Sequence, residues 1–271
     1  MPGATGTLAA PDDACAMPAG SSACPRRAGC RAVVRREETI TEDGGDVTYL
    51  LRVVLPDRPG TLGAVASALG GEGADILSVD VVERHQGVAV DDLVVDLPAA
   101  RPPDVLITAA ESVRDVTVES VRPFFGPLDT ARELELVEAV AADPDAGIAL
   151  LADAVPRIFR SAWALVVQAS TGDVWGDGGT RVHRVAASSA APETDAEALP
   201  WLPLTKATVL DPAGGHEVPS AWTDLDTELA AAPLGRPDRA LVLGRPGGPG
   251  FRPSELARIS HLGGIVATMT G

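Results

Sequence analysis

The sequence predicts an α+β fold made of two successive domains, and three observations support this expectation. First, 271 residues are too many for one small domain and suit two. Second, residues 48–124 show strand and helix periodicity in the order β-α-β-β-α-β. Third, a different series of amphipathic helices and alternating strands begins at residue 143. We therefore expect a disordered segment over 1–46, a first domain over 47–126, a connecting helix over 127–142 and a second α+β domain over 143–271.

The first domain is expected to contain a four-stranded sheet and two helices. Alternating apolar residues predict strands over 49–55, 76–82, 90–97 and 116–121. Apolar residues at helical spacing predict two helices, one from Leu62 to Leu69 and one from Leu106 to Val113. This order is that of the ferredoxin-like split unit, in which an antiparallel sheet carries both helices on one face.

The second of these strands, residues 76–82, is expected to form an edge of the sheet. Leu77, Val79 and Val81 alternate, and we expect them to face the core. An unpaired edge of apolar and β-branched residues favours pairing with another copy of the chain. The sequence therefore predicts a homodimer.

The turn before the first helix has the features of a small anion site. Pro59 suits a first helical position, and Gly60 leaves the amides at the helix start uncovered. We expect the amides of Gly60, Thr61 and Leu62 to donate to a carboxylate, assisted by the helix dipole. A free amino acid carries such a carboxylate.

Two motifs make residues 48–124 resemble an ACT domain, the small regulatory module that binds amino acids. They are Pro56-Asp57-Arg58-Pro59-Gly60-Thr61-Leu62 and Gly73-Ala74-Asp75-Ile76-Leu77-Ser78. The resemblance implies a ferredoxin-like fold, an effector site at the two motifs, and a dimer with effectors in its seam. The ligand-binding residues that it implies are Asp57, Arg58, Pro59, Gly60, Thr61, Leu62, Asp75, Ile76, Leu77 and Ser78.

The family pattern allows aspartate or asparagine at both positions, and with Asp57 and Asp75 this chain departs from the members that have asparagine there. Two acids would accept hydrogen bonds from an ammonium group, and they disfavour a dicarboxylic ligand and favour a cationic one. In the alternative interpretation the site is empty, Asp57 caps the helix and Asp75 is solvated in a turn. Arg58 either steers a carboxylate or lies on the surface.

The second half of the chain, from the connecting helix onward, is less regular. Helical stripes run from Leu134 to Val140 and from Ile148 to Ile158, with Asp143-Pro144 between them as cap and first residue. The remaining expected elements are strands over 162–169, 181–187, 205–210 and 239–244 and a closing helix from Leu256 to Met269. The acidic run 224–228 is interpreted as a solvated face or a helix start.

The end of the chain resembles the end of a GAF domain. The residues that carry this resemblance are the strand Ala-Leu-Val-Leu-Gly-Arg at 240–245, the glycine-rich turn after it and the closing helix. We therefore interpret residues 143–271 as GAF-like. The four tryptophans all fall in this half, where they either fill the core or line a pocket.

Composition and motif content exclude several function classes. The formal charge of −16 offers no basic face for nucleic acid or for an anionic membrane. No apolar run approaches the roughly 18 residues that span a bilayer, so a cytoplasmic location is expected. Cys15, Cys24 and Cys30 are interpreted as reduced thiols, with metal binding or redox sensing as the alternative. No zinc-type spacing, nucleophile elbow or nucleotide loop is found, so we expect no metal, cofactor or catalytic residue.

These observations favour a non-catalytic regulatory protein that senses an amino acid or related metabolite at a dimer interface. Two alternatives stay open. The chain is a partner-binding regulatory subunit that pairs with an enzyme through its ACT sheet, or its second half is a divergent enzyme that the first half regulates.

Overall fold

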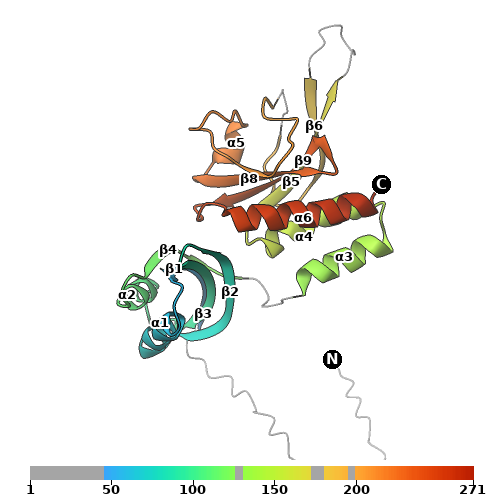
Figure 1. Ribbon diagram of the computed structural model, residues 1–271. Helices are drawn as coiled ribbons and strands as arrows, with labels where there is room; N and C mark the ends of the chain where they lie inside the picture. Colours follow the sequence, from blue (N-terminus) through green and yellow to red (C-terminus); the bar gives the residue numbers. More distant parts are fainter. Residues whose placement is uncertain (1–45, 126–130, 172–179, 195–198) are drawn as a thin grey trace, which may run out of the picture. The chain divides into compact units, whose positions relative to one another are not determined.

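The computed structural model describes residues 46–125, 131–171, 180–194 and 199–271 (Figure 1). All of them belong to one compact unit, Asp43–Gly271. They build two separate antiparallel sheets, and we call residues 46–125 the N-terminal lobe and residues 131–271 the C-terminal lobe. The segment expected to be disordered, 1–46, and the start of the expected connecting helix, 127–130, lie outside the described residues apart from Asp46.

The N-terminal lobe has the element order that the sequence predicts. Its elements are β1 (Val47–Pro56), α1 (Thr61–Gly71), β2 (Asp75–His85), β3 (Val88–Leu97), α2 (Asp104–Glu111) and β4 (Thr117–Pro123). The strands pair antiparallel in the spatial order β2-β3-β1-β4. This is the ferredoxin-like arrangement.

The two faces of this sheet carry different side chains because successive residues of a strand point to opposite sides. On the helix side, Leu51 and Val53 of β1 pack with Val65 of α1 and Leu106 of α2 in one buried cluster. On the other side, β1 places Arg52 beside Asp92 of β3, and both residues are buried. A buried ion pair on an otherwise apolar sheet indicates that this second face is also covered.

Strand β2 forms an edge of the sheet, as predicted, but its apolar side chains are not in the core. Leu77, Val79 and Val81 are 37%, 40% and 55% exposed. Val79 and Val81 do lie on the helix side, since they pair with Leu93 and Asp91 of β3. Helix α1 makes few contacts with β2, so an apolar strip remains on this edge.

The C-terminal lobe contains a five-stranded antiparallel sheet in the order β6-β5-β9-β8-β7. Its elements are α3 (Arg132–Ala142), α4 (Gly147–Ile158), β5 (Trp163–Thr171), β6 (Thr180–Ala187), β7 (Thr208–Leu210), α5 (Ser220–Thr223), β8 (Thr227–Leu234), β9 (Arg236–Pro246) and α6 (Pro253–Met269). The expected helices and four expected strands are present. The sequence analysis did not find β8, and the acidic run that it took for a solvated face or helix start leads into this strand.

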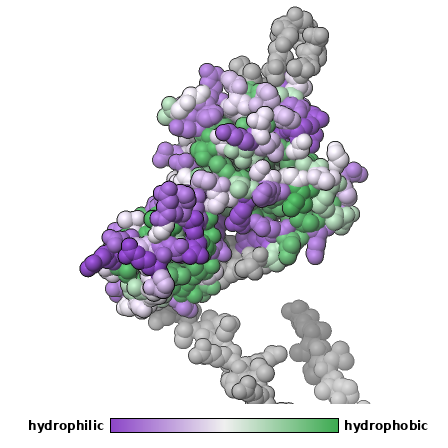
Figure 2. All heavy atoms as spheres, in the orientation of Figure 1, coloured by the Kyte–Doolittle hydropathy of each residue, from purple (hydrophilic) through white to green (hydrophobic). Residues whose placement is uncertain are grey.

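Both faces of this second sheet are covered. Helices α4 and α6 cover one face, and α3 packs against these two helices; Leu136, Leu151 and Ile259 belong to the same buried cluster. On the other face Trp163 and Trp222 pack with ring centroids 6.2 Å apart, and both are buried. Among the described tryptophans the role is therefore core packing, while Trp175 lies outside the described residues. Figure 2 shows hydrophilic and hydrophobic residues intermixed on the visible surface.

Candidate functional site

The start of α1 presents free backbone amides, as the sequence predicts. Gly60 is the residue before the helix and adopts φ 92°, a conformation that glycine takes without strain, and no side chain caps the helix. The amide of Thr61 donates to the carbonyl of Arg58 at 3.2 Å, and that of Ala64 donates to Gly60 at 2.9 Å. The amides of Gly60, Leu62 and Gly63 have no acceptor among the described residues, so two of the three expected donors, Gly60 and Leu62, are free, and the third, Thr61, is not.

Asp57, in the same turn, is held by an arginine that the sequence analysis did not single out. Arg84 at the end of β2 donates to both carboxylate oxygens of Asp57, with Nη2 2.7 Å from Oδ1 and Nε 3.0 Å from Oδ2. The hydrogen bond to Asp57 raises the pKa of Arg84. Asp57 therefore orients Arg84 and does not cap α1.

Asp91 of β3 is a second acid near this turn that the sequence analysis missed. It is 3% exposed, and its Oδ1 has no hydrogen-bond partner in the described part of the chain. Burial raises the pKa of Asp91, and the positive charge of Arg84 opposes that rise. Asp91 lies on the helix side of the sheet, paired with Val53 and Val81. The sequence did offer a signal for this residue: two consecutive acids, Asp91 and Asp92, interrupt a mainly apolar strand.

The structure places Asp75 at the opposite end of the sheet from Asp57. Val88 of β3 pairs with both Pro56 and His85, beside the turn, whereas Asp96 of β3 pairs with Asp75. These β3 residues are eight positions apart (96 − 88), or about 27 Å at 3.4 Å per residue. Within one chain the two acids therefore do not meet.

The other residues of the two motifs divide between several surroundings. Leu62 and Ile76 pack against the core of the N-terminal lobe. Arg58, Pro59 and Gly60 are exposed in the turn. Leu77 lies at a β-bulge, and Ser78 is on the sheet face away from the helices, paired with Val94.

A buried charge network lies on that second face and joins the two lobes. Arg52 of β1 donates from Nε to Oδ1 of Asp92 at 2.7 Å and from Nη1 to Oε2 of Glu255 in α6 at 3.2 Å. Arg245 of β9 donates to Oε1 of Glu255 at 2.7 Å. Glu255 also accepts the amide of Arg252 at 2.9 Å, so it satisfies a free donor at the start of α6. A single carboxylate therefore links β1, β9 and α6.

Burial and ion pairing shift the pKa values of the paired groups in opposite directions. For Glu255, burial favours the neutral acid, but the charges of Arg245 and Arg52 outweigh it and lower the pKa. For Arg52, burial is likewise outweighed by Asp92 and Glu255, so its pKa is raised. Burial lowers the pKa of Arg245 despite its contact with Glu255. Burial, followed by the charge of Arg245, lowers the pKa of Arg122 to about 10.

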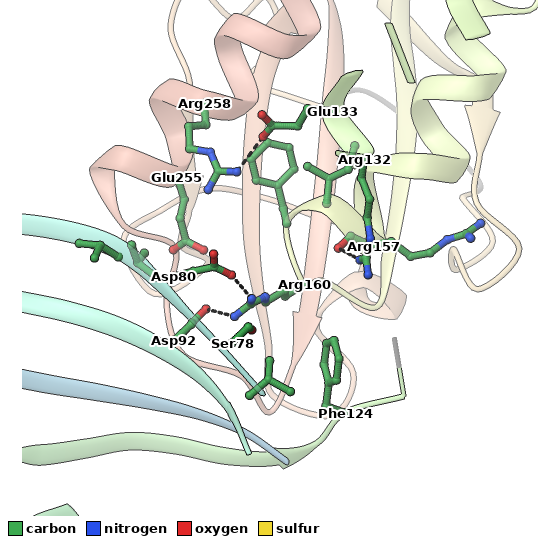
Figure 3. Close-up of a pocket in the computed structure, with 15 residues that line it drawn as sticks. Ser78, Asp80, Asp92, Phe124, Arg132, Glu133, Arg157, Arg160, Glu255 and Arg258 are labelled. Carbon is green, nitrogen blue, oxygen red and sulfur yellow. Dashed lines mark hydrogen bonds and ion pairs between the residues drawn. The ribbon is translucent and has the colours of Figure 1, made fainter. Parts of the chain in front are cut away.

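Beside this network is a pocket of about 170 Å³ (Figure 3). Its polar lining comes from Ser78, Asp80, Asp92, Arg132, Glu133, Arg157, Arg160, Glu255 and Arg258. Figure 3 shows Arg160 between the helices and the sheet, directed at Asp80 and Asp92. Its Nη1 lies 3.0 Å from Oδ2 of Asp92, and its Nη2 pairs with Asp80. Nothing in the sequence indicated this pocket, because its residues are distant along the chain.

A family model described as ACT domain matches residues 49–115, which hold β1, both motifs and both helices of the N-terminal lobe. Residues 49–115 are an ACT domain. An ACT domain implies a regulatory role through the binding of a small molecule. The match stops before β4 and does not extend to the C-terminal lobe, so the GAF-like interpretation stays a prediction.

Two solved structures are similar to parts of this chain. One is the ACT domain from the GTP pyrophosphokinase of Chlorobium tepidum, with 15% identity over 29% of this chain and 99% of that chain and a TM-score of 0.24. The other is an unknown protein from Galdieria sulphuraria, with 16% identity over 48% of this chain and 75% of that chain and a TM-score of 0.27. No curated protein matches the chain.

Among the described residues, metal-binding side chains do not cluster and no helix suits a membrane. No group of three or more histidine, cysteine, aspartate or glutamate residues is placed to hold a metal ion. Within the same residues, no helix has the length and apolar character needed to cross a membrane. The three cysteines all lie outside the described residues.

Proposed function

We propose that this chain is a non-catalytic regulatory protein whose ACT domain binds an amino acid or a related metabolite between two copies of the chain. The observation that carries the proposal is the position of the two motifs. The free amides at the start of α1 and Asp75 lie at opposite ends of one sheet. A site that contains both must therefore be shared between two chains.

Antiparallel pairing of two β2 edges brings the two motifs together. Ser254 donates to the carbonyl of Val82 at 2.6 Å, so pairing over residues 75–81 leaves that contact intact. In this register the partner's Asp75 lies opposite Val81, one strand away from Asp91. The exposed side chains of Val79 and Val81 would be buried by the same contact, which gives it an apolar driving force.

The chemistry of the shared site suits a zwitterion. The amides of Leu62 and Gly63 at the start of α1 would bind the carboxylate, because a helix N-terminus favours an anion. Asp91, on the helix side of the sheet, would accept the ammonium group, whereas the partner's Asp75, which pairs in register with Asp96 on the other face, would act on it only through its charge. A buried carboxylate without a partner costs free energy in the empty protein, and an ammonium ligand would offset that cost.

The first test measures the oligomeric state. We expect the wild-type protein to be a dimer in analytical ultracentrifugation and the Val79→Lys variant to be a folded monomer, because a charge on the edge strand opposes pairing. Ile265→Lys is the matched control, since Ile265 is 47% exposed on α6, away from β2. A monomeric wild type, or a Val79→Lys variant that still dimerises, would contradict the shared site.

The second test is isothermal titration of the full chain with each of the twenty amino acids. We expect at least one of them to bind, Asp91→Asn to weaken that binding at least tenfold, and Val79→Lys to abolish it. If none of the twenty amino acids binds, the sensing function is wrong. If another ACT-containing enzyme, mixed with the chain, takes the place of the second copy at β2, the partner-subunit alternative gains support instead.

A further inference from the structure

We propose a second ligand site, in the pocket beside the buried charge network, for a small metabolite that carries a carboxylate or phosphate group. The pocket is lined by one chain only, from β2 and β3 of the ACT domain and from α3, α4 and α6 (Figure 3). A second chain is therefore not needed to complete it, although Ser78, Asp80 and Val81 lie in the β2 segment that the proposed dimer would pair.

Four acids and four arginines line the pocket, and two further arginines, Arg52 and Arg245, pair with the lining acids from the network beside it. Each acid that lines it is already paired with an arginine: Asp80 with Arg160, Asp92 with Arg52 and Arg160, Glu133 with Arg258, and Glu255 with Arg52 and Arg245. Arg132, by contrast, donates from Nη1 to the backbone carbonyl of Arg157 at 3.0 Å, and no carboxylate in the described part of the chain pairs with it. Its guanidinium charge is uncompensated.

A second group of unpaired donors belongs to the buried charge network beside the pocket. Nε and Nη2 of Arg122 and Nε of Arg245 are buried, and no acceptor among the described residues reaches them. Arg122 is close enough to Arg245 and Arg160 for their charges to lower its pKa further. This concentration of guanidinium charge makes the junction electropositive in a chain whose net charge is −16. A local field of this sign favours an anion.

The volume of the pocket limits the ligand to a small molecule. Its volume of about 170 Å³ is below the roughly 300 Å³ at which pockets for drug-sized ligands begin. Phe124, Ile158, Phe159 and Val94 supply an apolar wall, while the guanidinium of Arg132 faces the same space. A planar guanidinium binds carboxylate and phosphate oxygens in the same forked geometry. The expected ligand is therefore a short organic acid or a small phosphate ester.

The backbone at Arg160 supports the assignment. Arg160 follows the last turn of α4 and has φ 52°, in the left-handed region that is strained for a residue other than glycine. Its conformation aims the guanidinium at Asp80 and Asp92 across the mouth of the pocket. Strained residues of this kind concentrate at ligand sites. A bound anion would compete with these two acids for Arg160.

The test titrates the full chain with four probes: succinate, glutarate, inorganic phosphate and 3-phosphoglycerate. We expect at least one probe to bind and to raise the melting temperature, and we expect added salt to weaken its binding. Arg132→Gln should weaken binding at least tenfold. Arg236→Gln, which removes an exposed arginine of a surface ion pair in β9, should change it less than twofold. Circular dichroism checks that both variants are folded.

The outcomes separate the two sources of oxyanion and the two proposed sites. Binding of the dicarboxylates alone assigns a carboxylate ligand, and binding of the two phosphate compounds alone assigns a phosphate ligand. Binding should persist in the monomeric Val79→Lys variant, because one chain lines the pocket. The proposal is overturned if no probe binds, if Arg132→Gln binds as tightly as the wild type, or if Val79→Lys abolishes binding.

Discussion

At the scale of single residues, Gly244 shows how a motif that resembles a ligand-binding family is used for packing. A side chain at this position of β9 would place its Cβ 2.0 Å from the indole of Trp163. The glycine therefore makes room for a tryptophan on the neighbouring strand, and Trp163 pairs with Gly244 in the sheet. The following residue, Arg245, is fully buried against the ring of Phe251 at 4.0 Å.

We expect Gly244→Ala to destabilise the protein by about 1 to 3 kcal/mol, because the added methyl group overpacks a rigid aromatic neighbour. Denaturant unfolding measures the change. Gly264→Ala in α6 is the control: its Cβ would meet nothing within 4 Å, and alanine is the better helix former by about 1 kcal/mol. Equal stability of Gly244→Ala and the wild type would show that Trp163 has room to move.

Glu255 gives a prediction with a defined dependence on pH. Its pKa is lowered in the folded protein, so the stability it contributes is present above the unfolded value of about 4.3. That contribution is lost as pH falls through the lower folded pKa. We expect Glu255→Gln to cost about 3 kcal/mol at pH 7, because two buried guanidinium groups lose their counter-charge. The cost should shrink below about pH 4.

Unfolding curves at pH 7 and pH 3 measure this difference. Glu72→Gln is the matched control, since Glu72 pairs with Arg101 on the surface, where both side chains are about 40% exposed. Exposed pairs contribute at most about 1 kcal/mol. A cost for Glu255→Gln that does not depend on pH would show that shape, and not charge, holds this junction.

The residues of the turn before α1 were predictable, and those around it were not. Pro59 and Gly60 determine a local backbone conformation, and local conformation is encoded by adjacent residues. Arg84 and Asp91 reach the turn through the pairing of three strands, which depends on register along the whole sheet. Periodicity predicts which face a residue takes, but it does not predict which distant charge lies next to it.

At the scale of elements, the end of α4 shows a local conflict that the tertiary structure resolves. The amide of Ser161 donates to the carbonyl of Pro156 at 2.9 Å, a bond that closes the helix and places Arg160 at the position where glycine is usual. Arginine is strained there. The ion pairs of Arg160 with Asp80 and Asp92 explain why a long side chain occupies this position.

Two substitutions of Arg160 distinguish the effect of backbone strain on stability from the effect of the ion pairs. Arg160→Gly and Arg160→Ala remove the same contacts, but only glycine relieves the left-handed backbone. We expect Arg160→Gly to be more stable than Arg160→Ala by about 1 kcal/mol in denaturant unfolding. If the alanine variant is equally stable, the end of α4 rearranges when the ion pairs are absent.

The elements of the ACT domain were all predictable, whereas β8 was missed for a physical reason. In the ACT sheet, helices cover one face, and the strands alternate clearly. Strand β8 lies inside the second sheet with both faces covered, and its Leu-Ala-Ala-Ala-Pro-Leu run has no period of two. Alanine also has no strand preference, so neither composition nor spacing indicates the element.

At the scale of the whole molecule, the buried network makes the ACT sheet depend on the C-terminal lobe. Arg52 and Asp92 would be exposed on an isolated sheet, but Glu255 and α6 cover them. A buried ion pair is weak evidence for net stability, because desolvation opposes the attraction of the charges. Its clearer consequence is specificity, since few other surfaces would match two arginines around one carboxylate.

Specific buried contacts of this kind predict that the two lobes unfold together. All four tryptophans lie beyond residue 143, so tryptophan fluorescence reports on the C-terminal half, whereas far-ultraviolet circular dichroism reports on both lobes. We expect the two denaturant curves to coincide for the wild type, as they do for one cooperative unit. In Glu255→Gln the ACT domain loses its ion pair with α6 and keeps only weaker contacts such as the hydrogen bond from Ser254 to Val82, so the dichroism should change before the fluorescence does. Separate transitions already in the wild type would show that the network binds the lobes too weakly to couple them, and in that case a ligand in the ACT domain has no route to the C-terminal lobe through Arg52.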